Sequence, residues 1–464
     1  MVKNAILRFC SRSADEQFGK ESPVTVMAQV LMSRIFAPER IDSLFTKYAT
    51  VQYQQDLLFS SQVDLMSLVV CGIQKSVHSA YKAKALNLSV STTALYKKLC
   101  GIELGVSQAL LRETARDLTE LVQLMGGEQP SLLPGYQLKI VDGTCLAGTD
   151  HRLNAIRNFA ASALPGKAIV VLEQCSKLVT DIFPLEDGHS QERSLFDSVL
   201  EQVKPQDLWC GDRNFCTAKF LFTIKEKKAF FVIRQHGGLG FRELSELKHL
   251  GSTQTGELFE QKVEFSYNGR TVEVRRVVLK LFVATRDEEW EIAILTNLPD
   301  AVPAAKTTEI YRNRWSLENL FQTVTENFNG EIQTLAYPKA ALFSFSMALV
   351  AYNILATLRG ALGSIHGVGK IEAGLSDFYL VDEIQGTYRG MMIAIPSTEW
   401  EPLVTFSLEQ IAQLLQQLAY NVKLKRFLKA KRGPKKPRPP LIVDSKHRHV
   451  STARLLNNYH KNKQ

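Results

Sequence analysis

The amino-acid sequence predicts an α/β protein in which a mixed sheet follows a helical N-terminal segment and is interrupted by a mostly-β segment. Three observations lead to this prediction. Apolar residues recur at helical spacing up to about residue 125, short apolar runs begin near residue 137, and a hairpin pattern lies between residues 237 and 300. Of the 464 residues, 45% are hydrophobic and 22% are charged, which excludes a disordered, collagen-like or low-complexity protein.

The N-terminal segment, residues 1–125, is predicted to form a helical domain and is a candidate DNA-binding region. Within residues 107–125, leucine and valine side chains recur at helical spacing among charged residues. Residues 88–99 combine a serine cap with a short basic helix, which is compatible with the second helix of a helix-turn-helix motif. A plain helical hairpin explains the same pattern and is the simpler interpretation. A linker rich in glycine and proline follows at residues 126–135.

Short apolar runs after the linker predict the strands of the sheet. They lie at residues 137–141, 168–175, 178–183, 207–210 and 230–233. Helical patterns at residues 192–203 and 217–227 separate the later runs. Three successive strands followed by alternating helix and strand favour a mixed α/β sheet.

Residues 237–300 are predicted to be a mostly-β insertion. Asn268-Gly269 separates the apolar runs 263–267 and 271–281, and this dipeptide supplies the positive φ angles of a tight hairpin turn. Residues 290–298 predict one more strand. Helices are predicted to resume near Thr307 and to continue through residues 340–359.

The stretch from Ala340 to Leu358 carries no charge and has about the length of a membrane span. Ser344, Ser346 and Asn353 interrupt it with polar side chains. A single span inside an otherwise ordinary globular sequence is the less economical interpretation. We therefore predict a buried core helix and no membrane partner.

The basic character of the protein is concentrated in a tail that the sequence places at residues 421–464. This segment holds 14 Lys and Arg residues and a single acid, Asp444. The prolines of residues 434–440 prevent a helix, so an extended arm is expected. Its residues Lys431, Arg432, Lys435 and Lys436 are candidate contacts to a polyanion such as DNA, although a merely solvated tail explains the run equally well.

The seven cysteines are scattered and include no Cys-x-x-Cys pair, so neither a disulfide framework nor a zinc site is expected. The first residues show no secretory signal, because charges interrupt the apolar run. Both observations favour an intracellular protein with reduced thiols.

Three acids are candidates for chemistry. Asp142 ends the first predicted strand, Asp212 follows the strand at 207–210, and Glu318 lies in a predicted helix, 70 and 106 residues apart in turn. Each has an ordinary structural explanation by itself, namely a turn, a helix cap and a surface carboxylate. Their value as a set therefore depends on the fold bringing them together.

The helix predicted around Glu318 is more informative than the acid alone. Tyr311, Arg314 and Glu318 stand at i, i+3 and i+7, on one face, whereas Leu317, Leu320, Phe321 and Val324 form the apolar face. An exposed Arg–Glu pair contributes little to stability. A carboxylate that binds a metal, a guanidinium that binds a phosphate and a tyrosine that bonds or stacks beside it give the row a chemical purpose.

The spacing Tyr311-x2-Arg314-x3-Glu318 resembles the Tyr-Arg-Glu-Lys signature of bacterial insertion-sequence transposases of the Asp-Asp-Glu class, in the insertion-sequence-four family. Residues 141–144 and 211–215 look like the family segments that carry its first and second aspartates. Residues 184–189 and 231–236 also look like family segments, and residues 334–338 and 351–353 do so more loosely. The resemblance covers roughly residues 130–365. The signature lysine is expected at position 325, where this chain has Thr325.

The resemblance implies a ribonuclease H-like mixed-sheet core. Its first part is expected at residues 136–236 and its last part, with the Glu318 helix, at residues 301–365, on either side of the insertion at 237–300. A C-terminal helical region is expected at residues 366–420, before the basic tail.

The resemblance also implies a DNA transposase that cleaves phosphodiester bonds at the ends of an insertion sequence and joins the 3′-hydroxyl ends to target DNA. Asp142, Asp212 and Glu318 are then expected to hold two Mg²⁺ ions, for which Mn²⁺ is expected to substitute. The residues expected to contact DNA, besides those of the tail, are Tyr311, Arg314, Arg213, Asn214 and Trp315. The expected partners are double-stranded DNA and, in the DNA complex, a second copy of the chain, in the bacterial cytoplasm at the nucleoid.

Two other functions are compatible with parts of the pattern. The absence of the signature lysine at Thr325 is consistent with a catalytically weakened, transposase-derived DNA-binding protein. A tyrosine recombinase using Tyr311 as nucleophile is disfavoured, because its Arg and His residues should precede that tyrosine, whereas His447-Arg448-His449 follows it.

Overall fold

The computed structural model describes residues 13–54, 56–85, 88–146, 164–285, 288–430 and 433. The strands form a sheet with the order β3-β2-β1-β4-β5-β10-β9-β8-β6, in which β7 also pairs with β8. Its strands are β1 (Gln137–Leu146), β2 (Gly166–Glu173), β3 (Val179–Leu185), β4 (Asp207–Gly211), β5 (Phe230–Arg234), β6 (Arg242–Glu243), β7 (Lys248–Ser252), β8 (Gly256–Tyr267), β9 (Arg270–Leu281) and β10 (Glu291–Thr296).

The first five strands have the arrangement of a ribonuclease H-like sheet. β1 pairs antiparallel with β2, and β2 pairs antiparallel with β3. On the other side, β1 pairs parallel with β4, and β4 pairs parallel with β5. The mixed α/β fold class predicted from the sequence is therefore confirmed. All five strands are rich in buried β-branched or aromatic residues, because the sheet is covered on both faces.

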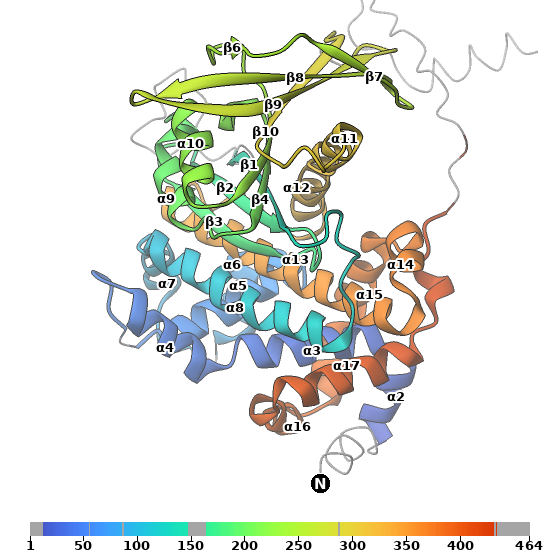
Figure 1. Cartoon of the computed structure of the whole chain (residues 1–464). Coiled ribbons are helices and arrows are strands. Elements are labelled where there is room, and N and C mark those ends of the chain that lie inside the picture. Colours follow the sequence, from blue (N-terminus) through green and yellow to red (C-terminus); the bar gives the residue numbers. More distant parts are fainter. Residues whose placement is uncertain are drawn as a thin grey trace, which may run out of the picture. The chain divides into compact units, whose positions relative to one another are not determined.

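The mostly-β segment extends this sheet instead of forming a separate one. β10 pairs antiparallel with β5, and β9 and β8 follow in order. Asn268 and Gly269 connect β8 to β9 with φ angles of 50° and 74°, as their turn chemistry predicts. Figure 1 shows β8 and β9 as a long antiparallel pair above the first five strands.

The described helices before the sheet are α2 (Ser13–Glu21), α3 (Pro23–Ile35), α4 (Pro38–Tyr48), α5 (Phe59–Val70), α6 (Val77–Ala83), α7 (Thr92–Leu99) and α8 (Leu104–Met125). Those after β3 are α9 (Phe196–Glu201), α10 (Ala218–Glu226), α11 (Ala304–Arg312), α12 (Trp315–Asn327), α13 (Pro338–His366), α14 (Val368–Gly374), α15 (Asp377–Ala394), α16 (Ser397–Trp400) and α17 (Leu408–Asn421). Ser91 caps α7 by accepting a hydrogen bond from the backbone of Ala94, as predicted.

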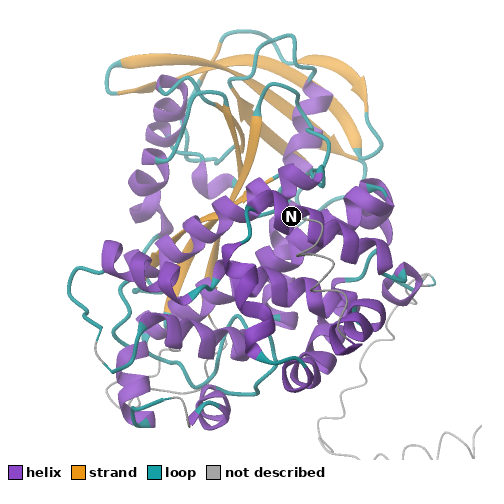
Figure 2. Cartoon of the chain, turned by 90° about the horizontal axis from the view of Figure 1, so that it is seen from below, coloured by secondary structure: helices purple, strands orange, loops and turns teal. Residues whose placement is uncertain are grey.

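Helix α13 joins the helical layer to the sheet. It packs against α3, α5 and α8 from the N-terminal segment, against α17 from the C-terminal region, and against β2 and β3. Figures 1 and 2 show these helices gathered on one side of the sheet. The N-terminal helices and the C-terminal helices therefore share one hydrophobic core instead of folding as separate bodies.

Within the described part of the chain, α13 is the one helix long and apolar enough to cross a membrane, and 94% of its most apolar window is buried inside the protein. This burial agrees with the predicted core helix. The polar Asn353 is accommodated because its side chain accepts a hydrogen bond from the backbone N–H of Val179 and donates one to the carbonyl of the same residue, both at 2.8 Å.

The basic tail begins later than the sequence indicated. The compact unit formed by the described residues ends at Leu428, and the segment from Lys429 onward does not belong to it. The predicted start at residue 421 is wrong because Val422, Leu424 and Phe427 are buried in the core, where a short 3₁₀ helix, η6 (Leu424–Phe427), lies. Charge counting placed the boundary too early because Lys423, Lys425 and Arg426 alternate with these apolar residues.

Candidate active site

Two of the three predicted acids lie at neighbouring positions on two interior strands of the sheet. Asp142 does not end its strand, as the sequence indicated, because β1 continues to Leu146. Asp142 lies in β1 and Asp212 directly follows β4, and these two parallel strands pair with Val141 opposite Gly211. Each aspartate follows one of these paired residues, and neighbouring strands lie about 4.8 Å apart. The fold therefore brings together two carboxylates that are 70 positions apart in the sequence.

Backbone hydrogen bonds hold both aspartates. The Oδ1 atom of Asp142 accepts a hydrogen bond from the N–H of Gly143 at 2.9 Å. Asp212 caps a 3₁₀ helix, η4 (Arg213–Phe215), because its Oδ1 accepts a hydrogen bond from the N–H of Asn214 at 2.9 Å. The capping role considered from the sequence is thus real, and it also fixes the direction of the Asp212 side chain.

Glu318 does not lie in the middle of one continuous helix, as the sequence indicated. Helix α11 ends at Arg312, and Glu318 lies in the first turn of α12. The side chain of Asn313 donates to the carbonyl of Glu309 at 3.2 Å, and the hydroxyl of Ser316 donates to the carbonyl of Asn313 at 2.7 Å. Such local side-chain bonds compete with the helical ladder and explain the break.

Arg314, at the start of α12, connects the third acid to the first. Its Nη1 lies 2.6 Å from Oδ2 of Asp142, and its Nη2 lies 2.6 Å from Oε1 of Glu318. Arg314 and Asp142 are both mostly buried, at 13% and 16% side-chain exposure, whereas Glu318 is 51% exposed. Helix α12 also packs against β1, so the three acids occupy one region of the protein.

The electrostatics of this region are those of a crowded anionic cluster. Burial raises the pKa of Asp142 to about 6, the positive charge of Arg314 opposes this, and the negative charges of Asp212 and Glu318 add to it. Burial works against the charge of Arg314, but Asp142 and Glu318 nevertheless raise its pKa above the ordinary value. The cluster therefore favours a cation among its carboxylates, and Arg314 supplies one.

The predicted DNA contacts differ in their exposure. Trp315 is 63% exposed at the start of α12, three residues before Glu318. Tyr311 is only 7% exposed and packs in the core, which raises its pKa and leaves little of its ring for stacking on a base. Thr325 is exposed on α12, seven residues after Glu318. Lys431, Arg432, Lys435 and Lys436 lie outside the described residues.

The other two predicted contacts, Arg213 and Asn214, belong to networks that the sequence did not indicate. Arg213 donates to Glu289 at 3.0 Å, and Arg234 pairs with the same carboxylate. These pairs, the hydrogen bond from Arg234 first, lower the pKa of Glu289. Asn214 donates to Glu192 at 2.7 Å and accepts a hydrogen bond from Arg193 at 3.2 Å.

A cavity of about 510 Å³ adjoins Arg213. It is lined by Arg213, Arg234, Gln235, His236, Gly237, Arg276, Glu289, Glu291 and Ala293. Arg234 lies in the segment 231–236, which the family resemblance had singled out without giving it a role. Its partner Glu289 could not be found from a local sequence pattern, because the two residues are 55 positions apart in the sequence.

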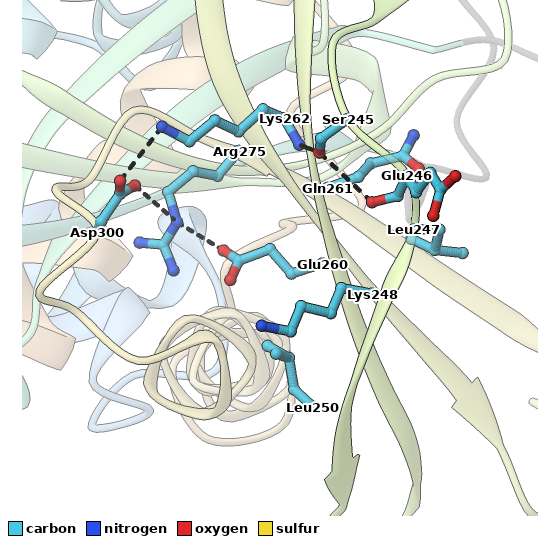
Figure 3. A pocket seen from close by; sticks show the side chains of 10 residues that line it. All are labelled: Ser245, Glu246, Leu247, Lys248, Leu250, Glu260, Gln261, Lys262, Arg275 and Asp300. Atoms are coloured by element: carbon cyan, nitrogen blue, oxygen red, sulfur yellow. Dashed lines mark hydrogen bonds and ion pairs between the residues drawn. The ribbon is translucent and has the colours of Figure 1, made fainter.

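Another cavity, of about 490 Å³, lies on the extended part of the sheet (Figure 3). Its lining includes none of the predicted site residues. Lys262 lies 3.2 Å from Asp300, and the mostly buried Arg275 lies 2.6 Å from Glu260. These charges largely neutralise one another, so this cavity lacks the excess of carboxylates that marks the first region.

The donors around Asp142 suit an oxygen-binding divalent cation. Among the described residues, no group of three or more His, Cys, Asp or Glu side chains is already arranged to hold a metal ion. Asp142 and Glu318 instead share the guanidinium of Arg314. Two aspartates on neighbouring parallel strands, and a third carboxylate bonded to the guanidinium of Arg314, are the oxygen ligands that Mg²⁺ prefers. The residues therefore fit such an ion once Arg314 exchanges its contacts.

Comparison with known families matches the segment that carries this cluster. Residues 133–354 match the family model of the transposase DDE domain. This DDE segment contains Asp142, Asp212 and Glu318. No match is found among curated proteins. Among solved structures, the chain is similar to piggyBac transposase in a cryo-EM synaptic complex with hairpin DNA, with 10% sequence identity, 82% of each chain covered and a TM-score of 0.42.

Proposed function

We propose that this protein is a DNA transposase that cleaves phosphodiester bonds at the ends of an insertion sequence and joins the freed 3′-hydroxyl ends to target DNA. The observation that carries the proposal is the meeting of Asp142, within β1, and Asp212, directly after β4, on neighbouring parallel strands, with Glu318 connected to Asp142 through Arg314. The match of residues 133–354 to the transposase DDE domain supports the same reaction. The spacing of Tyr311, Arg314 and Glu318 supports the bacterial insertion-sequence-four subgroup, from which Thr325 departs.

In this proposal Asp142, Asp212 and Glu318 hold two divalent cations, Mg²⁺ or Mn²⁺. When bound, two such ions activate the attacking oxygen and neutralise charge at the phosphate and the leaving oxygen. The role of the protein's carboxylates is to keep these positions fixed on the paired strands β1 and β4. Burial of Asp142 keeps bulk water away from one side of the site.

Arg314 has a second role in the same proposal. Once the carboxylates are neutralised by cations, its guanidinium is available to bind a DNA phosphate in a forked geometry. Trp315 and Arg213 flank the cluster and position the strand near it, and the cavity beside Arg213 offers room for the chain of phosphates. The partners are double-stranded DNA and a second copy of the protein in the DNA complex, in the bacterial cytoplasm at the nucleoid.

The decisive experiment removes single carboxylates. We expect Asp142→Ala and Glu318→Ala to reduce Mg²⁺-dependent cleavage of the element's end by roughly 10²–10³-fold or more, because each removes a group that stabilises the transition state. DNA binding should stay within a few-fold of wild type. Glu326→Ala is the matched control, since this exposed acid lies on the same helix and bonds Gln322.

The alternative function is tested by the same assay. If the wild-type protein binds its end sequence but cleaves it with neither Mg²⁺ nor Mn²⁺, the protein is a transposase-derived DNA-binding protein and the proposal fails.

A further inference from the structure

Resting on the proposed function, we propose that Glu192 is a positioning residue of the active site, which holds the two aspartates in register through Asn214 and Gly143. Glu192 begins a short 3₁₀ helix, η3 (Glu192–Leu195), that follows β3 and leads into α9. It lies outside every segment that the family resemblance singled out. Its carboxylate nevertheless lies against a residue next to each candidate aspartate, namely Gly143 beside Asp142 and Asn214 near Asp212.

The first contact is with the turn that presents Asp212. The Oε2 atom of Glu192 accepts a hydrogen bond from Nδ2 of Asn214 at 2.7 Å, and Arg193 donates to Oδ1 of the same amide at 3.2 Å. The backbone N–H of Asn214 in turn donates to Oδ1 of Asp212 at 2.9 Å. Two consecutive residues of η3 thus bond the amide nitrogen and the amide oxygen of the Asn214 side chain. The backbone N–H of Asn214 orients the Asp212 carboxylate.

The second contact is with the residue that follows Asp142. A Cβ atom built on Gly143 would lie 2.5 Å from Oε1 and 2.6 Å from Oε2 of Glu192, much closer than real Cβ atoms approach other groups. The carboxylate of Glu192 therefore occupies the space directly over the backbone of Gly143. Gly143 is not required for its backbone angles, since it is absent from the positive-φ glycines of the described chain. It is required because a side chain there would displace Glu192.

These contacts give Glu192 a role that hydrogen bonding alone can fulfil. What Asn214 needs from residue 192 is an acceptor oxygen, and an amide also supplies one. Groups that orient the ligands of a metal typically change metal affinity by about 10–100-fold when they are removed. A glutamine at position 192 should therefore preserve the function, whereas an alanine should not.

The test measures Mn²⁺ binding to the full-length protein by electron paramagnetic resonance, together with the Mn²⁺ dependence of cleavage. We expect Glu192→Ala to raise the Mn²⁺ dissociation constant about tenfold or more, and Asn214→Ala to do the same. Glu192→Gln should stay within about threefold of wild type. Wild-type Mn²⁺ affinity in Glu192→Ala would overturn the proposal. So would a Glu192→Gln variant as weak as Glu192→Ala, because the charge of Glu192 would then act directly.

A second experiment uses a steric change, so that the conclusion does not depend on a general loss of folding. Gly143→Ala should weaken Mn²⁺ binding as much as Glu192→Ala, because its methyl group displaces the carboxylate. The double variant should be no weaker than Glu192→Ala alone, since the residue that the methyl group displaces is already gone. Additive losses would overturn the proposal. Thermal unfolding of each variant shows whether it is folded.

Two further measurements distinguish a failure of the Glu192 proposal from a failure of the proposed function. Asp142→Asn reports on the metal site itself: if it binds Mn²⁺ as wild type does, the metal site proposed above is wrong. A metal-independent measurement addresses Glu192 directly. The amide proton of Asn214 should exchange faster with solvent in Glu192→Ala than in wild type, without any metal present, and an unchanged exchange rate would contradict the positioning role.

Discussion

At the residue scale, the electrostatics of the site are clearest at the carboxyl group of Asp142. It is buried beside two other acids, and one guanidinium compensates for them. Without a metal ion, the negative charges of such a site are incompletely balanced, and a bound cation balances them better. Arg314 limits the cost of the metal-free state, because it donates to two of the three carboxylates at once.

This arrangement predicts a pH-dependent stability. The pKa of Asp142 in the folded protein, raised chiefly by burial to about 6, lies above its ordinary value, so the folded state binds this proton more tightly than the unfolded chain. The resulting stability is fully present below about pH 4 and is lost as the pH rises through about 6. We expect Asp142→Asn to stabilise the metal-free protein by roughly 1–3 kcal/mol at pH 8, and by much less at pH 4.

Urea unfolding of metal-free wild type and Asp142→Asn between pH 4 and pH 8 measures this difference. Asp382→Asn serves as the control for removing an exposed carboxylate from α15. A stability difference that is the same at every pH would show that Asp142 carries no such linkage.

At the element scale, α13 connects the helical layer to the edge strand β3 of the sheet. Asn353 is fully buried on this helix and satisfies both backbone groups of Val179 on β3. Buried backbone groups without a partner are costly, so one side chain contributes twice here.

We predict that Asn353→Ala lowers the free energy of unfolding by about 2–4 kcal/mol, because it leaves the N–H and the carbonyl of Val179 without their side-chain partner. Chemical denaturation followed by circular dichroism measures the change. Thr357→Val is the matched control on the same helix, since its hydroxyl bonds the carbonyl of Asn353 within the helix, and its loss should cost less than about 1.5 kcal/mol. Equal losses for the two variants would refute the special role of Asn353.

At the scale of the whole molecule, Leu428 separates the segment that packs in the hydrophobic core from the basic C-terminal segment. Residues 429–464 contain 11 Lys and Arg residues and one acid, whereas residues 421–428 contribute apolar side chains to the core. DNA binding and folding should therefore respond to different truncations.

We expect removal of residues 429–464 to weaken DNA binding and to flatten its dependence on salt concentration, because each lost phosphate contact reduces the slope by about 0.9. The melting temperature should change little. Removal of residues 421–464 should additionally lower the melting temperature, since it takes Val422, Leu424 and Phe427 from the core. Fluorescence anisotropy at several salt concentrations gives the slope, and an unchanged slope after the shorter truncation would assign the tail another role.

Much of the fold was predictable from local sequence. Apolar runs located β2, β3, β4, β5, β9 and β10 within a few residues, and Asn268-Gly269 identified the hairpin turn, because such patterns act on the backbone over a few residues. The end of β1 and the start of β8 were placed several residues short, and the exposed strands β6 and β7 were missed. The three acids were candidates because of their places after predicted strands and in a predicted helix, and the family resemblance joined them into one set. The break between α11 and α12 was missed because it depends on hydrogen bonds of Asn313 and Ser316 that compete with an otherwise regular helical pattern.

The sequence by itself thus determined the elements, the turn and the acids that deserved testing. Only the tertiary structure decided that Asp142 and Asp212 lie side by side, that Arg314 joins two of the acids, that Glu192 lies over Gly143, and that the tail begins after Leu428. The physical reason is separation along the chain. Backbone preferences are set by near neighbours, whereas contacts between residues tens of positions apart depend on strand order and packing, which no local pattern encodes.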